Sequence, residues 1–114
     1  MPCITREQFR KASAVGEPTE VNVKGLGTVK IVPMTQKVRN DARNLASDQQ
    51  VEGFIDITRF NAYIVIGCVV DPKLDFKEDL QFIESLKAGV MDDLIKKIFE
   101  ISGIDIGVEE VKKN

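Results

Sequence analysis

The hydrophobic pattern of the chain centres on Phe60–Val70, FNAYIVIGCVV, the longest stretch without a charged residue. Arg59 and Asp71 close it on either side. No other stretch is as apolar, so any single core must include this one. Periodicity cannot separate a buried helix from a buried strand when every position is apolar. Both alternatives therefore stand at this step.

Length favours the helix. With Asp56 or Thr58 as its N-cap, the segment up to Val70 is long for a strand and contains no turn signal. We therefore predict a buried helix, with a strand as the alternative. Gly67 lies inside it and costs a helix about 1 kcal/mol relative to alanine. A glycine at this position is explained by the close approach of a second helix.

The clearest local pattern is the alternation of apolar and polar residues over Thr19–Val32, TEVNVKGLGTVKIV. It runs on both sides of a four-residue connection, Lys24 to Gly27, which predicts a two-stranded hairpin with one buried face. Glycine supplies the positive φ angles that such turns require. A hairpin alone is marginal, so we expect its apolar face to rest on helices. Pro33 ends the second strand.

Two polar helices flank the hairpin. Thr5 and Gln8 have the spacing of a capping box and predict a short helix over Thr5–Ser13, ended by the Gly16-Glu17-Pro18 break. Thr35 is the expected cap of a second helix, Gln36 to about Gln49. That helix has a thin apolar face and is followed by a polar breaker, Ser47–Gly53.

Two more helices follow the central run. Phe76–Leu86 carries apolar residues spaced by three and predicts a short helix after the Asp71–Asp75 loop. A regular amphipathic helix is predicted from about Ala88 to Ser102, with acids early and lysines later, as the helix dipole prefers. Gly103 suits the position just after its end.

These elements predict an α+β, mainly α fold, in which an N-terminal β-hairpin packs on a bundle of about four to five helices. A chain of 114 residues fits one domain, which we assign to residues 1–114 with loose ends at 1–4 and 104–114. We see no internal repeat and no second domain.

Composition narrows the class of protein. The chain has 16 basic and 18 acidic residues and a net charge of −2, so its overall charge attracts neither nucleic acid nor an anionic membrane. The apolar run of eleven residues is well short of the roughly 20 that a membrane-spanning helix needs. The N-terminus has no apolar signal-peptide region. We expect Cys3 and Cys68 to be free thiols, with Cys68 buried, in a reducing cytoplasm.

Candidate chemistry is sparse. The sequence has no histidine, the commonest general base and metal ligand, and its two cysteines lack CxxC spacing. Asp92-Asp93 and Glu109-Glu110 are adjacent pairs, which we interpret as solvated charge. Gly25-Leu26-Gly27 lacks a phosphate-binding glycine pattern and is better explained as a turn. We expect no enzyme activity, no metal and no cofactor.

Two small basic edges are candidates for nucleic-acid contact. Neither is interleaved with stacking aromatic residues, so solvated helix faces explain them better. Their members are Arg6, Arg10 and Lys11 on the first helix and Lys37, Arg39 and Arg43 on the second.

The order of the elements resembles phage tail assembly chaperones, small proteins of long-tailed phages and prophages. The resemblance covers roughly Thr5 to Gly103 and consists in the order of the elements and their pattern of residues. Its most specific pieces are Val23–Thr35, a Gly-x-Gly hairpin leading into Pro-x-Thr, and Cys68–Asp71 followed by Phe76. It implies a non-enzymatic role in the bacterial host cytoplasm. Such chaperones bind the tape measure protein and help recruit tail tube subunits.

Other classes stay open: a prophage-encoded adaptor that binds a different protein, or a small structural component of the tail. Self-association is a further possibility. The apolar stripe of the last helix is core by default, but part of it is our candidate for partner binding. The candidate partner-binding residues are Met91, Ile95 and Phe99 on that helix and Leu26 at the hairpin tip.

Overall fold

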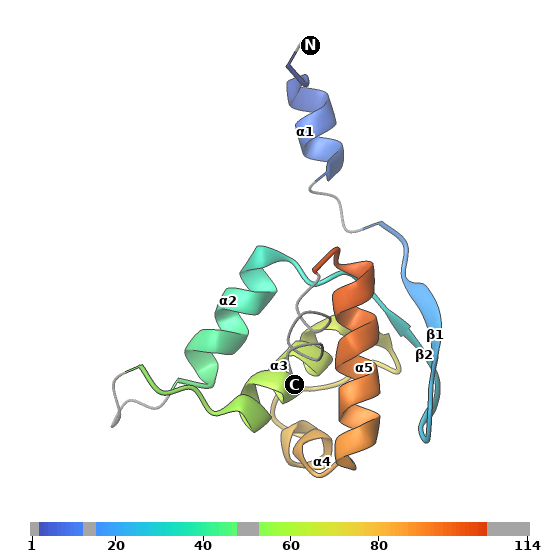
Figure 1. Cartoon of the computed structure of the whole chain (residues 1–114), viewed down its shortest axis with the longest axis vertical. Helices are drawn as coiled ribbons and strands as arrows, with labels where there is room; N and C mark the ends of the chain where they lie inside the picture. Colours follow the sequence, from blue (N-terminus) through green and yellow to red (C-terminus); the bar gives the residue numbers. More distant parts are fainter. Residues whose placement is uncertain (1–2, 13–15, 48–52, 105–114) are drawn as a thin grey trace, which may run out of the picture.

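The computed structural model describes residues 3–12, 16–47 and 53–104. Within these ranges the fold is α+β and mostly helical, as the sequence predicts, with three strands in one antiparallel sheet ordered β1-β2-β3 (Figure 1). The elements in chain order are α1 (Arg6–Ala12), β1 (Thr19–Val23), β2 (Gly27–Ile31), α2 (Gln36–Leu45), α3 (Ile57–Cys68), β3 (Val69–Asp71), α4 (Leu80–Glu84) and α5 (Ala88–Ile101).

The predicted hairpin is confirmed. Strands β1 and β2 pair with Val21 opposite Val29, so the apolar positions of both strands share one face. The turn closes when the backbone N–H of Leu26 donates to the carbonyl of Val23 at 3.0 Å. Gly25 has a φ of 84°, a conformation that residues with a side chain rarely adopt. The buried face of the hairpin rests on α5, as expected.

The central run forms a helix and then a strand. Asp56 caps α3 by accepting a hydrogen bond from the N–H of Arg59 at 3.2 Å, and the helix ends at Cys68. The prediction of a helix up to Val70 is wrong for its last residues, since β3 pairs with β2 and places Val69 opposite Ile31. Val69 and Val70 are β-branched, and Pro72 disfavours a helical conformation at Asp71 directly before it. The free edge of β2 then offers hydrogen bonds that a helix end lacks.

Helix α2 packs on α3 through Gly67. A Cβ atom built on Gly67 would lie 3.0 Å from Cγ1 of Val38, so the predicted close approach of two helices is confirmed. Thr35 caps α2, as predicted, by accepting the N–H of Val38 at 3.2 Å. The helix ends at Leu45, well before Gln49.

The early end of α2 has a structural reason. The carbonyl of Ala46 accepts the N–H of Asp56 at 2.9 Å, and Ser47 and Ile55 form an isolated antiparallel bridge. The chain therefore turns back toward α3 where the sequence pattern alone would extend the helix. The predicted last turn falls partly on residues 48–49, outside the described residues.

Helix α4 is shorter than the predicted Phe76–Leu86. The carboxylate of Asp75 accepts the backbone N–H groups two and three residues further on, both at 2.8 Å. Asp79 in turn accepts the N–H of Asp75 at 2.7 Å. The N–H of Asp79 also donates to the carbonyl of Asp75 at 3.0 Å, so residues 76–79 form a separate capped turn and bend, and the α-helix starts at Leu80.

The last helix follows its prediction closely. Helix α5 buries Leu94 and Ile98 and ends in a Schellman motif, in which the N–H of Ile104 donates to the carbonyl of Phe99 at 3.0 Å. Gly103 takes the left-handed conformation that the motif needs, with a φ of 74°. The predicted loose segment 104–114 lies outside the described residues apart from Ile104.

The core lies between the sheet, α2, α3, α4 and α5. Its largest fully buried side chains come from the hairpin, α3 and α5, and they are Ile31, Ile64, Leu94, Ile98, Val23, Val65 and Cys68. No helix of the described part is long and apolar enough to cross a membrane. Helix α1 contributes nothing to the core, because each of its residues is exposed and it stands apart from the rest (Figure 1).

Candidate functional site

An apolar groove lies between the hairpin turn and α4. It has a volume of about 340 Å³ and is lined by residues of β2, α3, β3, α4, α5 and their connections. The lining residues are Leu26, Thr28, Val29, Val65, Val69, Pro72, Leu74, Asp79, Phe82, Ile83, Leu86 and Leu94. Only Thr28 and Asp79 among them carry a polar side chain, so the groove suits an apolar occupant.

The groove combines a buried floor with exposed rims. Val65, Val69 and Leu94 on the floor are at most 5% exposed. On the rims, Leu26 is 45% exposed and Phe82 is 65% exposed. Large apolar side chains held in water above an apolar floor are typical of protein-binding sites.

Leu26 is positioned by a hydrogen bond that joins the hairpin turn to α5. The backbone N–H of Lys24 donates to the carboxylate of Asp93 at 3.1 Å. The ammonium group of Lys97 donates to both oxygens of the same carboxylate, at 2.8 and 2.9 Å. The Lys97 bond, followed by the Lys24 N–H, lowers the pKa of Asp93, so the group is charged at neutral pH.

Phe82 is positioned by contacts between α3 and the segment that carries α4. The guanidinium of Arg59 pairs with Glu84 at 3.4 Å. The rings of Tyr63 and Phe76 lie 5.8 Å apart between centroids, which anchors the preceding loop. Because Ile83 points into the core, the neighbouring Phe82 is left facing water on the short helix.

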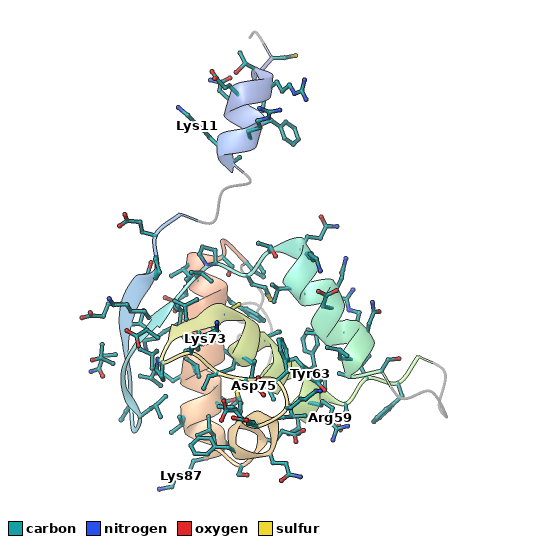
Figure 2. The ribbon with its side chains drawn as sticks, turned by 180° about the vertical axis from the view of Figure 1, so that it is seen from behind. Lys11, Arg59, Tyr63, Lys73, Asp75 and Lys87 are labelled. Carbon is teal, nitrogen blue, oxygen red and sulfur yellow. The ribbon has the colours of Figure 1, made fainter. Side chains whose placement is uncertain are left out.

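The loop beside the groove is acidic. Residues 71–79 contain four acids, Asp71, Asp75, Glu78 and Asp79, and two lysines, for a net charge of −2. Figure 2 labels Lys73 and Asp75 on this loop. Backbone N–H bonds from Glu78 and Lys77 lower the pKa of Asp75, which keeps it ionised. Asp79 of this loop lines the groove itself.

The predicted site residues fall in two places. Leu26 lies on the rim of the groove, but Met91, Ile95 and Phe99 are half-buried and pack against the core. Met91 also lines a smaller hollow of about 220 Å³, with Ile57 of α3. The structure therefore does not bring the four residues together.

Phe82 was missed by the sequence reasoning, although a signal for it exists. The apolar stripe of its segment is Leu80, Ile83 and Leu86, and a large aromatic residue just beside that stripe has no place in the core. An aromatic residue outside the apolar stripe of a short helix is thus the sequence feature that indicates the rim of the groove.

Groups capable of catalysis or metal binding are few in the described part of the chain. No cluster of three or more histidine, cysteine or acidic side chains that could hold a metal ion occurs there. Burial raises the pKa of the Cys68 thiol to about 12, so it stays protonated and unreactive. Cys3 is exposed and, like Cys68, a free thiol.

The basic edge of α2 is broken up by local contacts. Lys37 pairs with Asp41 at 2.8 Å, and that hydrogen bond raises the pKa of the lysine. Arg39 has a buried Nε with no hydrogen-bond partner among the described residues. This face does not present a continuous row of cations to a nucleic-acid backbone.

Comparison of the chain with protein-family models, curated proteins and solved structures gives no match. The interpretation of the groove therefore rests on its geometry and on the resemblance in sequence pattern.

Proposed function

We propose that the protein is a non-catalytic chaperone that binds an apolar helical segment of a partner protein in the groove between the hairpin turn and α4. The observation that carries the proposal is the pairing of exposed Leu26 and Phe82 over a buried apolar floor. Amphipathic helices bind such grooves by inserting apolar side chains spaced three or four residues apart. Phenylalanine is among the aromatic residues that are enriched in protein interfaces, which suits Phe82 as a contact residue.

The resemblance to phage tail assembly chaperones supplies the partner. A tape measure protein is long and helical, and before the tail tube surrounds it, its apolar helical surface is exposed to water. A small acidic protein with an apolar groove covers such surface and keeps the complex soluble. We further propose that the protein acts in the cytoplasm of the bacterial host and helps bring tail tube subunits to the tape measure.

Co-expression with a phage tape measure protein tests this proposal. We expect the tape measure protein to move from the insoluble to the soluble fraction and to co-purify with the chain. The Phe82→Asp variant should lose both effects while staying soluble itself. If the tape measure protein stays insoluble with the unmodified chain, or co-purifies equally well with Phe82→Asp, the proposal is wrong.

A further inference from the structure

Helix α1 exposes an apolar edge that no other described part of the chain covers. Ile4, just before the N-cap, is 60% exposed, and Phe9 is 69% exposed. The two occupy the N′ and N4 positions of a hydrophobic staple and line the same surface hollow. This arrangement presents an isoleucine and a phenylalanine side by side to water.

The helix is also well capped at its start. The N–H of Gln8 donates to the hydroxyl of Thr5 at 3.1 Å, and the N–H of Thr5 donates to the side chain of Gln8 at 2.8 Å. Seven residues are nevertheless too few for a helix that is stable alone in water, because nucleation is costly. A capped helix with an exposed apolar edge gains stability when that edge is buried against another surface.

The groove matches α1 in charge as well as in apolar character. Helix α1 carries Arg6, Arg10 and Lys11 against Glu7, a net charge of +2. The loop at residues 71–79, which reaches the groove through Asp79, carries a net charge of −2. Complementary charge of this kind orients two surfaces and speeds their encounter.

The two surfaces lie at opposite ends of the molecule. Helix α1 extends beyond the end of the hairpin where Thr19 pairs with Ile31, whereas the groove lies beside the turn at the other end (Figure 1). Figure 2 shows the same separation between Lys11 on α1 and Asp75 on the acidic loop. An arm that points away from its own groove is placed to reach the groove of a neighbour.

We propose that α1 of one copy docks into the groove of a second copy, with Phe9 against Leu26 and Phe82 and the basic side chains of α1 beside the acidic loop. The free protein then self-associates through a surface that a partner helix also uses. Binding a partner requires α1 to leave the groove, so partner binding dissolves the self-associated form. The self-association itself needs no tape measure protein, so it can hold even where the proposed function fails.

Sedimentation velocity of the full chain across a range of concentrations tests the proposal. We expect the unmodified protein to associate as its concentration rises. Phe9→Asp and Phe82→Asp should each raise the dissociation constant at least about tenfold, the loss typical of an aromatic anchor. Phe54→Asp is the matched control, since Phe54 is 50% exposed and lines neither surface, and it should associate like the unmodified protein.

An equimolar mixture of Phe9→Asp and Phe82→Asp separates docking between copies from docking within one chain. One variant keeps an intact groove and the other an intact α1, so the mixture should associate more tightly than either variant alone at the same total concentration. A monomeric unmodified protein overturns the proposal. A mixture that stays monomeric also overturns it, because it shows that α1 does not bridge two copies.

Discussion

The backbone N–H of Lys24 donates a 3.1 Å hydrogen bond to the carboxylate of Asp93, which joins the hairpin turn to α5. The two residues are 69 positions apart in the sequence. Through this bond, the turn that carries Leu26 is held against the helix that supplies Leu94 to the floor of the groove. The shape of the groove therefore depends on one half-buried carboxylate.

Asp93→Asn should weaken the dependence of stability on pH. The pKa of Asp93 in the folded protein lies below its ordinary value of 3.8, so its stabilising effect is complete above that pH. The effect is lost as the pH falls through the folded-state pKa. Urea unfolding between pH 7 and pH 2 should show a smaller acid-induced loss of stability for Asp93→Asn than for the unmodified protein. Asp92→Asn removes the same charge one residue away and should keep the full acid-induced loss of stability. If stability falls equally with pH in the two variants, the role of Asp93 is contradicted.

The effect of Gly67→Ala on the free energy of unfolding should depend on the side chain at Val38. Alanine at a helical glycine gains about 1 kcal/mol, but here the new Cβ would lie 3.0 Å from Cγ1 of Val38. In the unmodified chain we expect that gain to be cancelled or reversed. In a Val38→Ala background the crowding is removed, and Gly67→Ala should stabilise by about 1 kcal/mol. Denaturant unfolding of the four proteins measures the coupling, and additive effects would show that α2 and α3 are not in close contact there.

Met91→Asp should destabilise the fold, because Met91 is half-buried and packs against the core. We expect a loss of about 1–3 kcal/mol in the free energy of unfolding, measured by urea titration followed by circular dichroism. Phe82→Asp is the control, and its exposed side chain should leave the free energy within about 0.5 kcal/mol of the unmodified protein. An unchanged midpoint for Met91→Asp would instead support the sequence-based assignment of Met91 to a partner-binding surface.

Cys68 should resist alkylation until the protein unfolds. The residue is fully buried, and its burial raises the thiol pKa to about 12, so raising the pH to about 9 leaves it protonated. Iodoacetamide followed by intact-mass measurement should show one added group, at exposed Cys3, and a second only in denaturant. The Cys3→Ser variant should take up none when folded. Rapid labelling of that variant would contradict the burial of Cys68.

Most of the fold follows from local sequence signals. The hairpin is visible in the alternation around Lys24–Gly27, and the Thr35 and Asp56 caps mark where α2 and α3 begin. The cap signals are local because their hydrogen bonds join residues three apart. The close approach of a second helix at Gly67 was also predictable, since such an approach explains a glycine inside a buried helix.

The errors at the ends of α2 and α3 came from pairings with other segments of the chain. Strand β3 exists because β2, some 40 residues earlier, leaves an edge to which Val69 can pair. Helix α2 stops early because the chain returns to bond at Ala46. The residues that pair between β2 and β3 lie too far apart for one sequence window to contain both.

The candidate site was only partly predictable for a related reason. Exposure on α5 depends on how α3 and β1 cover it, so periodicity alone does not show that Met91, Ile95 and Phe99 are half-buried. Leu26 was found because a turn tip is exposed whatever packs below it. The position of Phe82 beside the apolar stripe is a signal in the sequence, and the structure confirms its exposure because Ile83 fills the inward position of α4.

The most direct test of the groove as a helix-binding site is a titration with the partner. Helical fragments of the tape measure protein, each carrying a fluorescent label, are titrated with the unmodified chain, Phe82→Asp and Phe54→Asp, and the anisotropy is followed. We expect saturable binding of at least one fragment, weakened about tenfold or more by Phe82→Asp and unchanged by Phe54→Asp. Equal binding by all three proteins, or binding by none, would contradict the account.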